Sequence, residues 1–352
     1  MSDEVTFSAD LLRRYATDLF TAAGLSAQAA GRVSDALIEA DLSGRGSHGM
    51  LQADRYIERL IAGAMSIADA PQVVSRSHGA IVLDADGMEG HLVAEDAMTL
   101  AIETARETGI AAVAVRRAQH MGVVGRYVRM AAEAGCVGIA MGNTKPVMAA
   151  PGGVEKLVGT NPLAIGIPAT REAVVLDMAT SAGTYGRIRQ ANALGLDIPA
   201  GWALDADGVA TTDPAEAMKG LLLPVGGAKG FALSFMIDLL AGLLSGGAWG
   251  TKLGLIDDST VGPQMSSYLF IVLDIASFRP LEEFKAEADE AIAGVRQSQR
   301  AEGVDRIYTP GERSAEQLAA SKGAIRLAPA VVKALAERGR QLGITVPAEF
   351  LE

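Results

Sequence analysis

The sequence predicts an α/β protein with a mixed β-sheet that is not a Rossmann fold, and with helical lobes formed by the N- and C-terminal segments. Three observations support this prediction. Apolar runs of strand length alternate with helical periods from about residue 80 onward. Amphipathic helical patterns occupy both ends of the chain. Residues 44–49 spell G-x-G-x-x-G, but the residues before them, RVSDALIEADL, have a helical period, whereas a Rossmann fingerprint follows a strand.

The N-terminal segment is expected to be helical. Ser8 can cap a first helix that Gly24 ends, and Ser26 can start a second helix. A glycine-rich break at 43–49 separates these from a third helix through Tyr56.

Apolar runs in the rest of the chain predict the strands of the sheet, at 80–85, 110–115, 137–142, 163–168, 173–179 and 268–274. The runs at 163–168 and 173–179 are close enough to form a hairpin. Helices are expected at 95–109, 126–135, 231–244, 282–300 and from Pro329 to Gly343. The helix at 231–244 is apolar nearly all round and therefore needs cover on every side.

Composition excludes several classes of protein. The chain has 352 residues and a formal net charge of −11, and phosphate binding needs a basic surface, so no nucleic-acid partner is expected. No basic amphipathic stretch, 18-residue apolar run or signal-peptide pattern occurs, so we expect a cytoplasmic protein without a membrane partner. The single Cys136 is expected to be a packed thiol, and no metal site is expected because no zinc-type Cys/His spacing exists.

Four histidines are the candidates for acid–base chemistry. His48 and His120 lie among glycines and small polar residues, in GRGSHGM and RAQHMGVVG. Such a histidine can give a proton to a carbonyl oxygen as hydride reaches the carbon, although a structural role explains either residue alone at least as well. His78 lies in a polar turn before a strand, and His91 is expected to be exposed or to cap a helix.

Three loops, together rich in Gly with Lys, Thr and Asn, could hold an anion. They lie at 143–146, 150–162 and 224–230, and Lys229 adds a positive charge at a helix start. A turn followed by a helix cap explains each loop equally well. Asp177 ends an apolar strand, where it could bind a ribose or cap the next turn.

Seven segments, in this order, resemble the malate/L-lactate dehydrogenase family of the second type, which includes ureidoglycolate, sulfolactate and diketogulonate oxidoreductases and cyclic-imine reductases. The segments are ADLSGRGSHG, QHMG, APGG with GTNPLAIGIP, VVLDMATS, IPAGWALDADGVATTDP, LLPVGGAKGFAL and YTPGE. Each alone is a loose match, but their common order and spacing are specific.

The resemblance implies a homodimer with the site in a cleft between lobes. It implies a helical, substrate-side lobe from residues 1–117 and 315–352 and a cofactor-binding lobe from 118–314. His48, supported by Ser47, would deliver the proton, whereas the residue matching His120 has the acid–base role in the ureidoglycolate enzymes.

The resemblance also implies NAD or NADP as cofactor and a small carboxylate as substrate. Residues carried over as cofactor contacts are Thr144, Asp177, Met178, Ala179, Arg187, Lys229, Gly230, Gly311 and Glu312. Those expected to face the substrate are Gln52, Thr160 and Asn161.

Two positions depart from the family pattern. Gln52 stands where the family usually has an Arg that can grip a carboxylate, so Arg45 or Arg55 would have to replace it. Arg187 follows Gly186 where hydroxy-acid members have Lys and cyclic-imine members tend to have Asp. The positive charge favours an oxo-acid or hydroxy-acid substrate.

The sequence therefore predicts hydride transfer between a nicotinamide and a 2-oxo/2-hydroxy acid pair. A reductase of cyclic imino acids is the alternative enzyme. A dinucleotide-binding protein without turnover is the alternative of another class, and the retention of both His48 and His120 argues against it.

Overall fold

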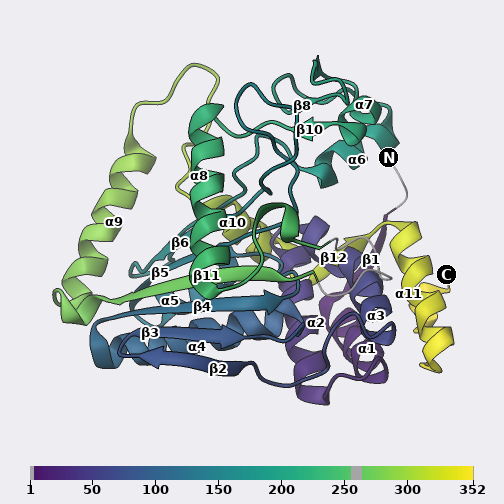
Figure 1. Ribbon diagram of the computed structural model, residues 1–352, viewed down its shortest axis with the longest axis horizontal. Coiled ribbons are helices and arrows are strands. Elements are labelled where there is room, and N and C mark those ends of the chain that lie inside the picture. The colour runs from purple at the N-terminus through teal and green to yellow at the C-terminus, as the bar shows by residue number, and fades with distance from the viewer. Residues whose placement is uncertain (1–3, 255–263, 352) are drawn as a thin grey trace.

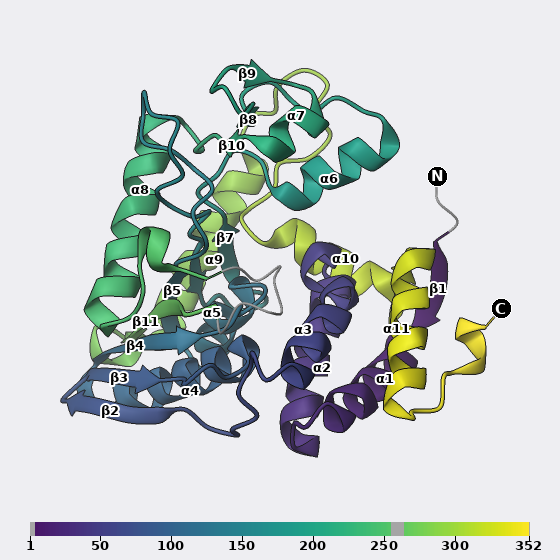
Figure 2. The ribbon, with the colours of Figure 1, turned by 45° about the vertical axis from the view of Figure 1, so that its right-hand side comes forward.

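The computed structural model describes residues 4–254 and 264–351. A seven-stranded sheet forms the centre of one lobe, a bundle of terminal helices lies beside it, and a small lobe lies above (Figures 1 and 2). Within the described ranges, no helix is both long and apolar enough to cross a membrane.

The large sheet has the order β2-β3-β4-β11-β5-β6-β7. Only β3 and β4 pair in parallel, so the predicted mixed sheet is confirmed. The predicted hairpin is also confirmed, because β6 and β7 pair antiparallel with Leu163 opposite Met178. The strands are β2 (Gln72–Ser77), β3 (Ala80–Asp84), β4 (Ile110–Ala118), β5 (Cys136–Gly142), β6 (Leu163–Ile167), β7 (Val174–Met178) and β11 (Ser266–Asp274).

Helices cover both faces of this sheet, which explains why its central strands read as continuous apolar runs. On one face α4 (Gly90–Thr108) and α5 (Gly125–Glu133) pack over a core that includes Val113, Tyr127 and Phe270. On the other face α8 (Ala228–Asp238) contributes Ile237 to a smaller cluster. Cys136 is fully buried, as expected.

The terminal segments build the helical lobe, as predicted. It contains α1 (Ala9–Ala22), α2 (Ala27–Leu42), α3 (Ala53–Ile61) and α11 (Pro329–Leu342), with a two-stranded sheet of β1 (Val5–Ser8) and β12 (Ala324–Leu327). The side chains of Ser8 and Ser26 accept N–H bonds at the starts of α1 and α2, so both predicted caps are confirmed.

The small lobe was not indicated by the sequence patterns. It consists of α6 (Tyr185–Leu194), α7 (Pro214–Lys219) and a three-stranded sheet of β8 (Ala203–Leu204), β9 (Ala210–Thr211) and β10 (Leu221–Leu222). Strands of two residues are too short to show an alternating pattern.

The remaining helices are α9 (Leu281–Gln297), which has no buried residue, and α10 (Glu312–Ser321). The helix expected at 231–244 is α8 continued by a π-helical segment, Leu239–Leu243.

Residues 44–49 do not form a dinucleotide-binding turn. They follow α2 and contain a short 3₁₀ helix, Gly46–His48, so the prediction of a non-Rossmann fold is confirmed. The expected lobe boundary at residue 118 falls at the end of β4, and the large sheet includes strands from both sides of it. The division into a substrate-side and a cofactor-binding lobe therefore does not coincide with the edge of the sheet.

Candidate active site

The loop that contains His48 is held between α2 and α3. It begins after α2, and a second 3₁₀ helix, Met50–Gln52, leads from it into α3. The N–H of Met50 donates to Oδ2 of Asp41 at 2.8 Å. A Cβ on Gly49 would lie 2.1 Å from the Asp41 carboxylate, so this position requires glycine. Burial raises the pKa of Asp41 to about 7.

The His48 imidazole is tied to the same loop. Its Nδ1 lies 2.9 Å from Oγ of Ser47, and the Gln52 side-chain amide donates to the Ser47 carbonyl at 2.7 Å. Arg55 in turn donates to Oε1 of Gln52 at 3.2 Å. Gln52 thus stabilises the His48 loop, and its hydrogen bond with Arg55 holds that guanidinium beside the loop.

His120, which follows β4, meets His48 directly. The two rings are stacked, with centroids 5.5 Å apart and planes inclined by 29°. Nδ1 of His120 lies 2.7 Å from the hydroxyl of Tyr56 on α3. Both histidines are catalytic candidates from the sequence, and the structure brings them together. No sequence pattern singles out Tyr56, which lies 64 residues from His120 and has no local motif.

Burial holds both imidazoles in their neutral forms. Burial, with smaller contributions from Arg45 and His91, lowers the pKa of His48 to about 4. Burial lowers the pKa of His120 well below its usual value, and the neighbouring His48, His91 and Arg55 act in the same direction. In the free site both imidazoles are therefore uncharged at neutral pH.

The other two histidines differ from this pair. His78 is exposed in the turn between β2 and β3, as expected. The expectation that His91 is exposed or caps a helix was wrong. Glu89 is the cap of α4, and its buried carboxylate also lies 2.6 Å from Nδ1 of the buried His91. The contact with the buried Glu89 carboxylate holds the His91 imidazole in the protein interior.

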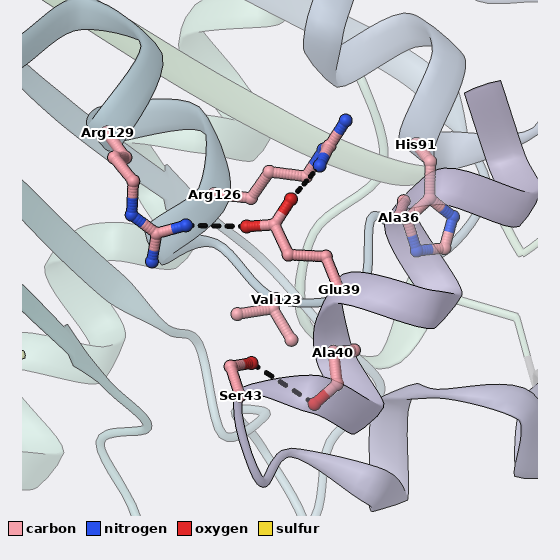
Figure 3. Close-up of a pocket in the computed structure, with 8 residues that line it drawn as sticks. All are labelled: Ala36, Glu39, Ala40, Ser43, His91, Val123, Arg126 and Arg129. Carbon is pink, nitrogen blue, oxygen red and sulfur yellow. Dashed lines mark hydrogen bonds and ion pairs between the residues drawn. The ribbon is translucent and has the colours of Figure 1, made fainter. Parts of the chain in front are cut away.

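Ion pairs hold the helical lobe to the sheet lobe next to His91. Figure 3 shows Glu39 of α2 between Arg126 and Arg129 of α5, with His91 lining the same small pocket. Glu39 pairs with both arginines, at 2.5 Å for Arg129. This contact fixes α2, and with it the start of the His48 loop, relative to α5.

Thr144, Thr160 and Asn161 form one cluster beyond the end of β5. The Thr144 N–H donates to Oδ1 of Asn161 at 2.9 Å, and the Thr160 N–H donates to Oγ1 of Thr144 at 3.0 Å. The buried amide of Asn161 also donates to the carbonyl of Ser234 on α8. The three predicted residues are therefore held together and to α8.

Asp177, at the end of β7, faces the histidine loop. Its carboxylate lies 3.9 Å from Nη1 of Arg45. Burial raises its pKa, against the opposing effects of Arg45 and the Gly125 N–H. Met178 and Ala179 follow and are partly buried.

Lys229 and Gly230 open α8, next to the same edge of the sheet. Lys229 is exposed, and Gly227 supplies no side-chain cap to the helix. A Cβ on Gly230 would lie 2.0 Å from the carbonyl oxygen of Val225. The N–H of Val225 in turn donates to the carbonyl of Thr180, which follows Ala179. The structure therefore places this helix start close to the end of β7.

Arg187, Gly311 and Glu312 lie around this group. Arg187 is exposed on α6, where the neighbouring Gly186 approaches the Ser47 side chain. Gly311 has a φ of 89° and packs against Val175 of β7. The buried Glu312 accepts bonds from Thr309 and pairs with Arg296 and Arg306, and these partners lower its pKa to about 2.

Comparison with known proteins identifies the family of the chain. The family model described as malate/L-lactate dehydrogenase matches residues 7–336. The chain belongs to this family. The resemblance stated from seven segments and the expectation of a dehydrogenase are confirmed.

Three curated relatives and one solved structure illustrate this similarity. A malate dehydrogenase of Pyrococcus abyssi is 35% identical, covering 86% of this chain and 85% of its own. An L-sulfolactate dehydrogenase of Methanothermobacter thermautotrophicus is 40% identical, covering 80% of this chain and 82% of its own. A Δ1-pyrroline-2-carboxylate reductase of Ancylobacter novellus is 32% identical, with 83% and 87% covered. The solved sulfolactate dehydrogenase of Methanocaldococcus jannaschii superposes with a TM-score of 0.92 at 33% identity, covering 97% and 98%.

Proposed function

We propose that this protein interconverts a small 2-oxo acid and its 2-hydroxy acid by hydride transfer, with His48 exchanging the proton. The stacked pair of His48 and His120, with Nδ1 of each bound to a hydroxyl, is the observation that carries this proposal. Two imidazoles held in this way leave Nε2 of each for the oxygen of a substrate. The malate and sulfolactate dehydrogenases among its relatives support this substrate class.

His48 accepts the substrate's hydroxyl proton in the oxidative direction and returns it in the reductive direction. Its lowered pKa keeps the free imidazole neutral, so it is ready to act as a base. A bound carboxylate favours the protonated imidazolium and so prepares His48 to act as an acid. Ser47, whose Oγ bonds Nδ1 of His48, orients the ring in both directions.

We propose NAD or NADP as the cofactor, which would supply and accept the hydride. The residues at the end of β7 and at the start of α8 fit a dinucleotide. The first turn of α8 has no side-chain cap and Lys229 is exposed, so this helix start suits a diphosphate. Gly230 leaves no room for a side chain, because a Cβ there would meet the Val225 carbonyl. Asp177, Met178, Ala179, Thr144, Arg187, Gly311 and Glu312 would complete the site, with Glu312 holding its loop in place.

Arg55 is the proposed partner of the substrate carboxylate. Gln52, which was expected to face the substrate, donates its side-chain amide to the Ser47 carbonyl. Arg55 is tied to the loop of His48 through Gln52 and lies near enough to His120 to affect its pKa. Thr160 and Asn161 would border the same substrate.

A reductase of cyclic imino acids is the second candidate, because one relative is a pyrroline-2-carboxylate reductase. Both substrate classes carry a carboxylate beside the carbon that receives hydride, so the same arginine could serve either. The positive charge of Arg187 favours the oxo acid.

We further propose that the protein is a homodimer. The outward side of α8 and the π-helical segment exposes Phe235, Met236, Leu240, Leu243 and Leu244. Figure 2 shows α8 on the side of the sheet lobe that faces away from the terminal helices. A concentration of exposed apolar side chains on one segment is typical of a protein interface.

The test is a spectrophotometric panel of 2-oxo acids and cyclic imino acids, each with NADH and with NADPH. We expect oxidation of reduced cofactor with at least one 2-oxo acid and slower turnover of the imines. Turnover of imines alone would establish the second candidate. Tight cofactor binding without turnover of any substrate would instead indicate a dinucleotide-binding protein.

A further inference from the structure

Tyr56 and His120 share a partly buried hydrogen bond whose direction follows from its surroundings. The Tyr56 hydroxyl lies 2.7 Å from Nδ1 of His120, and its side chain is almost completely buried. A neutral imidazole carries its single proton on either Nδ1 or Nε2. The position of that proton decides what His120 can offer to a substrate oxygen.

The described residues supply one partner to the Tyr56 hydroxyl, and that partner is His120. If Nδ1 of His120 carried the proton and donated to Tyr56, the hydroxyl proton of Tyr56 would need a second acceptor. The described part of the chain offers none within bonding distance, and a buried hydroxyl proton rarely stays unpaired. The hydroxyl of Tyr56 therefore donates to Nδ1, which leaves the imidazole proton on Nε2.

The charges around the pair are consistent with two neutral groups. Burial and the carboxylate of Glu89 raise the pKa of Tyr56 far above its usual value, although Arg55 acts in the opposite direction. His48, His91 and Arg55 all disfavour a positive charge on His120. The facing groups thus come from α3, α4 and the His48 loop, and they keep a phenol beside an uncharged imidazole.

We propose that Tyr56 is a positioning residue that fixes His120 as the Nε2–H tautomer, so that His120 donates a hydrogen bond to the substrate oxygen while His48 exchanges the proton. This inference rests on the proposed function and assigns different roles to the two histidines. In reduction, hydride adds to the carbonyl carbon and the C–O double bond becomes single. His48 then transfers its proton to the oxygen, while the N–H of His120 stabilises the negative charge as it develops.

The first experiment reads the tautomer without turnover. Protein labelled with ¹⁵N-histidine has four imidazoles, and a His120→Gln variant assigns the signals of His120. We expect long-range ¹H–¹⁵N correlations of the whole protein to show a protonated Nε2 and a bare Nδ1 at neutral pH. A protonated Nδ1, or an imidazolium, would overturn the proposal regardless of whether any substrate has been found.

The second experiment separates a donor from a proton carrier. A glutamine can present an N–H near the place of Nε2–H but cannot titrate. We therefore expect His120→Gln to retain at least tenfold more kcat than His120→Ala, whereas His48→Gln is as inactive as His48→Ala. Equal loss in H120Q and H120A, with activity kept in H48Q, would reverse the two roles and contradict the proposal.

The third experiment tests Tyr56 itself against a matched tyrosine. Tyr15 is also buried and donates to a backbone carbonyl, that of Leu335 at 3.0 Å, in the helical lobe. Each Tyr→Phe variant removes one hydrogen bond made by the hydroxyl of a buried tyrosine. We expect Y56F to lower kcat about tenfold, with cofactor affinity unchanged and the His120 signals shifted toward a mixture of tautomers, and Y15F to change neither. Identical behaviour of the two variants would show a purely structural role for Tyr56.

Discussion

Nη1 of Arg45 lies 3.9 Å from Oδ2 of Asp177 and joins the His48 loop to the end of β7. One partner belongs to the proposed proton-transfer side of the site and the other to the proposed cofactor side. The Arg45 side chain is 42% exposed, so the pair itself contributes little to stability. The two residues would matter through their positions on the two sides of the proposed site, and not through the strength of the ion pair.

Asp177→Asn is expected to weaken binding of the reduced dinucleotide by about tenfold, because the variant loses a charged acceptor for the ribose. Arg45→Met, which breaks the same ion pair from the other side, should leave that affinity almost unchanged. Fluorescence titration with NADH and NADPH measures both. Equal effects of the two substitutions would mean that the ion pair, and not a cofactor contact, explains the role of Asp177.

Arg55→Gln is expected to raise KM for a 2-oxo acid by about 10- to 100-fold, the range for losing a hydrogen-bonded partner of a charged group. The variant should also lose the preference for the acid over its uncharged carboxamide. Arg45→Gln is the matched control and should retain this preference. A carboxamide preference that is unchanged in R55Q would assign carboxylate binding to another group.

The low pKa of His48 makes a prediction about pH. A base must be deprotonated to act, and the pKa of His48 is about 4 in the free protein. The kcat/KM for hydroxy-acid oxidation should therefore stay constant as pH falls from neutrality to about pH 5, where an unperturbed histidine is already mostly protonated. It should decline only as pH approaches the pKa of His48. A decline centred near the usual histidine pKa of about 6.5 would contradict the assignment.

The apolar face of α8 leads to a prediction about assembly. Met236→Glu combined with Leu243→Glu places two charges on this face and should convert the dimer to a monomer in sedimentation experiments. Leu196→Glu is a control, since Leu196 is 57% exposed but lies after α6 in the small lobe. A wild-type monomer at micromolar concentration would exclude the proposed dimer.

The sequence predicted six of the seven strands of the large sheet because their residues form apolar runs, as in β11. It missed β2, whose residues are all exposed. It placed His48 and His120 in one site through the family resemblance. The contacts that give each histidine its role depend on the tertiary fold and leave no local pattern. Tyr56 reaches His120 only because α3 packs beside the end of β4, and His91 is buried only because the carboxylate of Glu89 turns inward.

The most direct test of the proposed chemistry is the kcat of His48→Ala compared with that of His78→Ala. Both histidines lie in Ser-His-Gly, and in both Nδ1 faces the preceding serine hydroxyl, but His78 is exposed in a turn. With the best substrate from the panel, we expect H48A to lose about 100-fold or more in kcat with little change in cofactor affinity, as for removal of a general acid. H78A should match the wild type. Equal and small effects of the two substitutions would contradict the central role of His48.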